Sequence, residues 1–178
     1  MVKGKFWQGD VAAKVVFPLS NEFTQGNRAH EGICTAASLA WARACLRLGR
    51  FVNSWDEIGT SKHNLNIVMA TLRHMDANPV GQTELAGLKS MSGGVDGTAT
   101  SMSDVIEAIK VSQFGVGIFW NSFHTMGYGY SHKQKDFFDM NYGLFRAKYS
   151  KGIQAKVEEL YGSDGAGKII GYRILGSL

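Results

Sequence analysis

Cys34 has the position of a reactive thiol. It lies in the segment Glu31-Gly32-Ile33-Cys34-Thr35, in the opening turn of the strongest predicted helix of the chain. A helix N-terminus stabilises negative charge, which lowers the pKa of a thiol and favours the nucleophilic thiolate. Most free cysteines are small buried apolar residues, so the position alone leaves both a catalytic and a structural role open.

The second cysteine, Cys45, is predicted to belong to the core. It lies about 16 Å further along the same helix, so it cannot join Cys34 in a disulfide or a metal site. Two cysteines in 178 residues do not make a disulfide framework, which favours a reducing compartment.

His124 is the histidine best placed to serve as base for a thiol. It lies in the apolar stretch 119–126, where an imidazole without a partner would be costly. Asp139 stands among two phenylalanines and a methionine, where a lone carboxylate would be equally costly. If strands at 123–131 and 136–141 form a hairpin, the two side chains lie together and the carboxylate fixes the imidazole tautomer. A purely structural His–Asp pair fits the same pattern.

The elements that position these residues are predicted from composition and periodicity. Helices are expected at 34–48, 65–75, 104–112 (with Ser103 as its cap) and 153–161. Short aromatic strands are expected at 115–121, 123–131, 136–141 and 144–149, with a closing strand at 168–175. A long loop with a short strand is expected at 79–100, and an irregular N-terminal segment at 1–31. Helices followed by an antiparallel sheet indicate an α+β fold, and the absence of a visible boundary predicts a single domain, 1–178.

Composition and charge narrow the function classes. Apolar residues make up 44% of the chain, which is typical of a globular domain. The net charge of +4 is mild and acidic residues are interspersed, so nucleic acid is not expected as a partner, whereas an acidic protein or membrane surface stays open. The sequence contains no run of 18 apolar residues, so no membrane-spanning helix is expected. Residues 1–10 lack the apolar core of a Sec signal peptide.

The common metal and nucleotide motifs are missing. The sequence has no CxxC, HExxH, calcium loop, Walker motif, dinucleotide-binding glycine motif or GxSxG. Neither a metal nor a cofactor is therefore expected.

Three segments together resemble the YopT/AvrPphB family of cysteine peptidases. Residues 32–41 (GICTAASLAW) resemble the family's nucleophile helix, and 124–126 (HTM) resemble its histidine strand. Residues 137–143 (FFDMNYG) resemble its Phe-Asp-Pro-Asn-x-Gly motif, with Met140 where the family commonly has proline. The three motifs occur in the family's order. Phe145 and Leu160-Tyr161 stand where the family has an aromatic residue and a terminal helix, so the resemblance spans residues 34 to 161.

The resemblance implies a papain-like α+β fold in which an N-terminal nucleophile helix packs on a C-terminal antiparallel sheet. It assigns Cys34 as nucleophile, His124 as general base and acid, and Asp139 as the residue that orients the histidine. The backbone N–H of Cys34 is the expected first donor of the oxyanion hole, and the side-chain amide of Gln25 or Asn27 is a candidate for the second.

The family also implies a biological setting. Its members are mostly bacterial effectors that enter host cells, so the resemblance predicts an effector or toxin that is a cysteine protease acting on a host protein. Such a protein would be secreted without a Sec signal and act in the target-cell cytosol; otherwise the expected location is cytoplasmic. Close structural relatives use the same three residue types to deamidate a glutamine of a host protein, so a protein-glutamine deamidase is the alternative. A non-enzymatic binding module is the remaining one.

Overall fold

The structure of the protein is a computed structural model that describes residues 12–19, 33–61, 64–65, 67, 88–90, 97–110 and 113–177. Its helices are α1 (Ile33–Leu48), α4 (Met102–Ile109) and α5 (Ser150–Tyr161), with short 3-10 turns η2 (Asp56–Ile58) and η3 (Gly165–Gly167). Its strands are β1 (Lys14–Pro18), β2 (Leu88–Ser90), β3 (Gly97–Thr98), β4 (Phe114–Trp120), β5 (Thr125–Ser131), β6 (Lys135–Asp139), β7 (Gly143–Ala147) and β8 (Gly171–Ser177).

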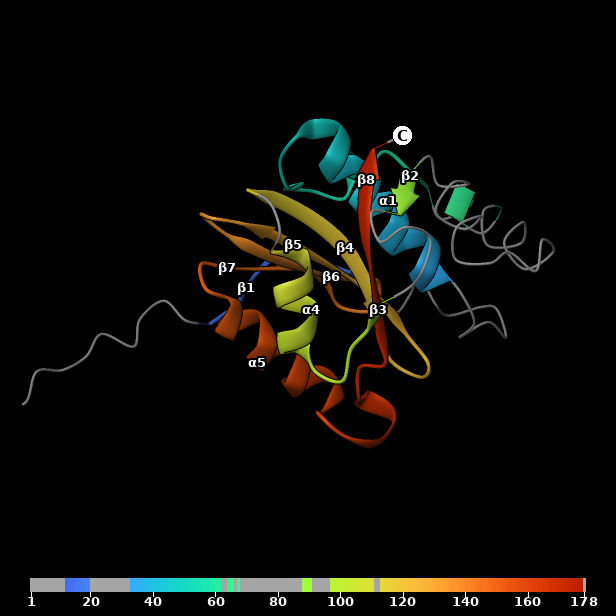
Figure 1. Ribbon diagram of the computed structural model, residues 1–178. Coiled ribbons are helices and arrows are strands. Elements are labelled where there is room, and N and C mark those ends of the chain that lie inside the picture. The colour runs from blue at the N-terminus through green and yellow to red at the C-terminus, as the bar shows by residue number, and fades with distance from the viewer. Residues whose placement is uncertain are drawn as a thin grey trace, which may run out of the picture.

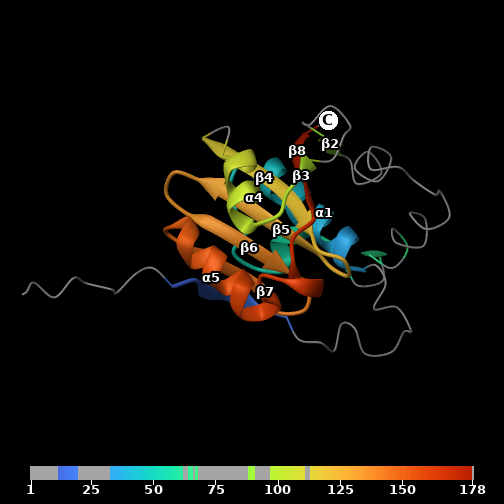
Figure 2. The same cartoon turned by 60° about the horizontal axis from the view of Figure 1, so that its bottom comes forward.

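The described strands form one antiparallel sheet in the order β1-β7-β6-β5-β4-β8-β2, with β3 also paired to β8. The helix α1 covers one face of this sheet, and α4 and α5 cover the other (Figures 1 and 2). The fold is therefore α+β, with α1 packed on an antiparallel sheet, as the sequence predicts.

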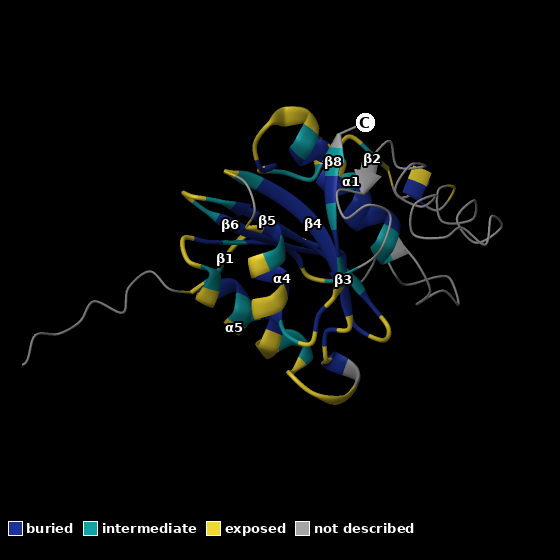
Figure 3. Cartoon of the chain, in the orientation of Figure 1, coloured by how far each residue is buried: buried dark blue, intermediate teal, exposed yellow. Residues whose placement is uncertain are grey.

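Alternation along the strands divides the core between the two faces. Ile118 and Phe138 belong to the cluster under α1, whereas their neighbours Phe119 and Phe137 belong to the cluster under α4 and α5. Successive side chains of a strand point to opposite faces, and here both faces are buried. The central strands β4, β5 and β6 are accordingly buried along most of their length (Figure 3).

A glycine of β5 allows α1 to approach the sheet closely. The Trp41 ring of α1 lies over Gly127 and stacks on Phe138 of β6, with ring centroids 5.7 Å apart. A Cβ atom at position 127 would lie 2.5 Å from the Trp41 ring, well inside contact distance. Close packing between the helix that carries Cys34 and the strand that follows His124 therefore depends on this glycine.

We expect Gly127→Ala to lower the free energy of unfolding by about 1–3 kcal/mol, because the new methyl group forces Trp41 and α1 outward. Urea denaturation of the purified variant measures this loss. In the Trp41→Leu background, where the ring is absent, Gly127→Ala should cause a smaller loss in the free energy of unfolding. Equal stability of Gly127→Ala and the natural chain would contradict this account of the packing.

Two expectations about local structure need adjustment. Helix α4 begins at Met102 and its cap is Ser101, not Ser103, because Ser101 and Asp104 exchange hydrogen bonds in a capping box. The segment 1–31, expected to be irregular, contains β1, whose backbone pairs with β7. Of the helix expected at 65–75, only Leu65 and Ile67 lie among the described residues, and both are helical.

Other elements match the sequence prediction to within a few residues, notably α1, α5 and strands β4 to β8. In the described part of the chain, no helix has the length and apolar character needed to span a membrane. A single domain over 1–178 remains a prediction.

Candidate active site

The Cys34 thiol lies in the first turn of α1, half-buried against β5. Two side-chain contacts hold this turn to the first residue of β5. Thr35 Oγ1 lies 3.0 Å from Thr125 Oγ1, and Ser38 Oγ donates to the Thr125 carbonyl oxygen at 3.2 Å. The start of α1 is thereby fixed beside the residue that follows His124 in the chain.

A tight turn between β4 and β5 sets the position of His124. Asn121 Oδ1 accepts hydrogen bonds from the backbone N–H groups of Phe123 (3.1 Å) and His124 (2.8 Å). The Asn121 N–H donates in turn to the His124 carbonyl oxygen at 3.1 Å. This Asn-capped turn leads the chain from one strand into the next and places the imidazole over the start of α1.

The structure places His124 and Asp139 side by side at the same end of β5 and β6. His124 Nε2 lies 3.1 Å from Asp139 Oδ1, and the Asp139 side chain is fully buried. The same carboxylate oxygen accepts the Asn141 N–H at 2.7 Å, and Tyr161 Oη donates to the other, Oδ2, at 2.5 Å. Because Nε2 faces the carboxylate, Nδ1 is the ring nitrogen left for the Cys34 thiol.

The environment favours a charged thiol–imidazole pair. Burial opposes ionisation of Cys34, but the hydrogen bond and positive charge of His124 outweigh it, so the pKa of the thiol is lowered. Burial likewise opposes protonation of His124, but hydrogen bonds to Asp139 and Cys34 raise its pKa to about 9. Opposite shifts on neighbouring groups indicate that each stabilises the charged form of the other.

The environment of Cys45 has the opposite effect on the pKa of its thiol. It is fully buried in the core cluster under α1, and burial raises the pKa of its thiol to about 12. The surroundings of the two free cysteines of this helix therefore shift their thiol pKa values in opposite directions.

The remaining predicted site residues, Gln25 and Asn27, lie outside the described residues. The structure adds three residues to which the sequence analysis gave no role in the site: Asn121, Thr125 and Tyr161. An Asn-Ser pair between two strands is a turn signal and could have identified Asn121. No local signal marks Tyr161, because its contact with Asp139 joins α5 to β6.

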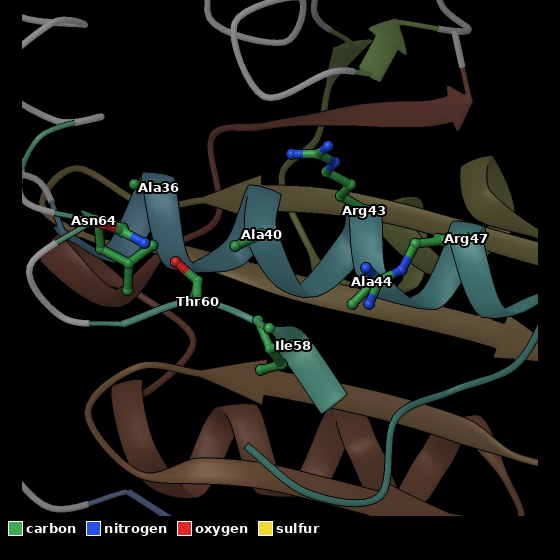
Figure 4. Close-up of a pocket in the computed structure, with 10 residues that line it drawn as sticks. Ala36, Ala40, Arg43, Ala44, Arg47, Ile58, Thr60 and Asn64 are labelled. Atoms are coloured by element: carbon green, nitrogen blue, oxygen red, sulfur yellow. The ribbon is translucent and has the colours of Figure 1, made fainter. Parts of the chain in front are cut away.

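A cavity of about 320 Å³ lies along α1, away from these residues. Ala36, Ala40 and Ala44 line its helix side, with Arg43 and Arg47 at its edge (Figure 4). Neither Cys34 nor His124 lines it, so this cavity is separate from the thiol–imidazole pair. No group of three or more His, Cys, Asp or Glu side chains able to hold a metal ion occurs in the described part of the chain.

Comparison with known proteins finds similarity in structure alone. No protein-family model and no curated protein matches the sequence. The chain is similar to PatoxP, a cysteine protease-like domain of the Photorhabdus asymbiotica toxin PaTox (TM-score 0.57, 15% identity). This match covers 93% of the chain but 54% of PatoxP, so the chain spans about half of that protein's length.

Two further structures share the fold. The Pseudomonas avirulence protein AvrPphB matches with a TM-score of 0.54 and 14% identity, over 92% of this chain and 95% of AvrPphB. The ubiquitin-specific protease of murine cytomegalovirus tegument protein M48, solved with a ubiquitin-based suicide substrate, matches with a TM-score of 0.57 and 14% identity. That match covers 84% of this chain and 79% of the viral protease. The resemblance to the AvrPphB group is thus confirmed at the level of the fold.

Proposed function

We propose that the protein is a thiol hydrolase that cleaves a protein substrate, with Cys34 as nucleophile, His124 as general base and acid, and Asp139 as the residue that orients His124. The observation that carries the proposal is the arrangement of the three side chains. The thiol at a helix start has a lowered pKa because of His124, and His124 is held by a buried carboxylate. This is the relation of nucleophile, base and orienting group that covalent acyl transfer requires.

The chemistry follows from these positions. The Cys34 thiolate attacks the carbonyl carbon of an amide, the carbonyl π electrons move to oxygen, and a tetrahedral oxyanion forms. His124 then donates its proton to the leaving nitrogen as the C–N bond breaks, which leaves a thioester on Cys34. Water, deprotonated by the same imidazole, attacks the thioester and releases the acid and the free thiol. The Cys34 backbone N–H is the expected first oxyanion donor, with Gln25 or Asn27 as the candidate second.

The fold supports a cysteine protease with a protein substrate, because the three structural neighbours include a cysteine protease-like domain and a ubiquitin-specific protease. Two of the three neighbours come from a bacterial toxin and a bacterial avirulence protein. We therefore infer that this chain acts on a protein of a target cell, in the cytosol of that cell. Deamidation of a glutamine would use the same three side chains with ammonia as leaving group.

The first test is the reactivity of Cys34 with iodoacetamide at mildly acidic pH. We expect rapid alkylation of Cys34 at about pH 6, where an ordinary thiol with a pKa of about 8.5 is protonated. Cys45 should remain unmodified, because its pKa is raised and it is buried. Mass spectrometry of the digested protein measures both sites in one sample. Equal, slow labelling of the two cysteines would overturn the proposal.

The second test identifies the reaction. The protein is incubated with a target-cell lysate, and the peptides are compared with those from a parallel incubation with a Cys34→Ala variant. New peptide termini indicate proteolysis, whereas conversion of glutamine to glutamate without new termini indicates deamidation. If neither change is observed in a sample whose Cys34 is reactive, both reactions are excluded on the proteins of that lysate.

A further inference from the structure

Tyr161 ends α5 and completes the surroundings of Asp139. Its hydroxyl donates to Asp139 Oδ2, while His124 Nε2 and the Asn141 N–H both use Oδ1. Both oxygens of the carboxylate therefore accept hydrogen bonds. A carboxylate held in this way cannot rotate about its Cβ–Cγ bond without losing at least one of these contacts.

The ring of Tyr161 also covers the imidazole. Its centroid lies 5.5 Å from that of His124, with an angle of 28° between the planes, so the rings are stacked. The rings of Phe123 and Tyr142 each lie 6.1 Å from the Tyr161 ring. His124 is only 7% exposed as a result of this environment and its strand neighbours.

Burial makes the hydroxyl contact important. Asp139 is 0% exposed, and a buried charge is tolerated only when its oxygens are supplied with donors. Without the tyrosine hydroxyl, Oδ2 would lose its donor inside the protein. Burial and the negative charge of Asp139 raise the pKa of Tyr161, so its hydroxyl keeps the proton that it donates.

We propose that Tyr161 is a positioning residue of the hydrolase: its hydroxyl fixes the Asp139 carboxylate so that Oδ1 faces His124, and its ring excludes water from the contact between them. The proposal rests on the proposed function of Cys34, His124 and Asp139. Tyr161 touches neither the thiol nor the substrate carbonyl, and it acts through Asp139 and the imidazole.

The variant Tyr161→Phe tests the hydroxyl while the ring remains. We expect kcat to fall about 10- to 100-fold, the range that corresponds to one hydrogen bond to a charged group, with little change in KM. The rate of Cys34 alkylation at about pH 6 should fall as well, because a less well supported imidazolium leaves more of the pair as neutral thiol and imidazole. Loss of the hydroxyl from a tyrosine with only a structural role would leave the pH dependence of Cys34 alkylation unchanged.

Tyr142→Phe is the matched control, since it removes the hydroxyl from a neighbouring, partly exposed ring that touches Tyr161. It should keep the natural kcat and alkylation profile. Thermal unfolding of both variants shows whether the fold is retained. A natural alkylation profile in Tyr161→Phe, or an equal loss in both variants, overturns the role of Tyr161.

The alkylation assay separates this proposal from the one on which it rests. If Cys34 of the natural chain is not selectively labelled at acidic pH, the hydrolase proposal fails and the role of Tyr161 fails with it. If Cys34 is selectively labelled and Tyr161→Phe labels equally fast at every pH, only the role of Tyr161 fails.

Discussion

A Cys34→Ala variant is expected to lose hydrolysis of the protein substrate by about 10⁴-fold or more, since residues of a nucleophile triad act as a unit. The methyl group cannot form the thioester, and what remains is the small effect of binding and of backbone donors. The rate at which product peptides appear in a target-cell lysate measures the loss. Cys34 is not part of the core clusters, so the substitution should leave the unfolding temperature nearly unchanged.

Cys45→Ala is the matched control, on the same helix and with the same change of side chain. It should keep the hydrolytic rate, although the small cavity left in the core should lower the stability by about 1 kcal/mol. If Cys34→Ala kept the full biological effect, the binding-module alternative would replace the enzyme. Loss of the effect in Cys45→Ala at unchanged stability would show that the chemistry has been assigned to the wrong thiol.

The parts of the site that could be predicted are those encoded in local patterns. The Cys34 helix is marked by its alanine and leucine content, and the strand periods around 123–131 and 136–141 place His124 and Asp139 across one hairpin. The register of that hairpin, with Gly127 opposite Phe138, is what brings the two side chains to the same end. These inferences need only neighbours in sequence and the period of a strand.

The parts that could not be predicted depend on contacts between distant segments. Tyr161 reaches Asp139 across 22 residues, and no sequence period announces such a contact. A glycine beside such a site can serve the close approach of a substrate or the formation of a turn. Gly127 and Gly129 instead accommodate the rings of Trp41 and Phe51, which only the packing of α1 and its following segment on the sheet reveals.

Met140, which stands where the resembling family commonly has proline, is also explained only by contacts between distant segments. The Met140 side chain is 1% exposed and packs in the cluster under α1, beside the turn that follows Asp139. At this departure from the motif, the chain therefore places an apolar side chain in the core cluster that also contains residues of α1. A motif comparison alone shows the difference but not where the longer side chain goes.

Replacing His124 with glutamine is expected to have the second large effect. His124→Gln should lower the hydrolytic rate by about 10³-fold or more, because an amide neither accepts a proton from the thiol nor donates one to the leaving nitrogen. The glutamine amide can still donate to Asp139, so the buried carboxylate keeps a donor where the imidazole was. The rate of peptide release and the unfolding temperature, measured together, separate lost chemistry from lost structure.

The pH dependence of Cys34 alkylation carries a prediction of definite sign for the same variant. In the natural chain, His124 overrides burial and the pKa of Cys34 is lowered. In His124→Gln, burial still raises the pKa of the Cys34 thiol, but the hydrogen bond and charge of His124 no longer lower it. The pKa of Cys34 should therefore rise, and its labelling should shift from acidic to alkaline pH. His132→Ala, at the exposed turn between β5 and β6, removes a histidine far from the thiol and should leave the profile unchanged. A buried His–Asp pair with a merely structural role predicts the opposite outcome, in which acidic labelling of Cys34 survives the loss of His124.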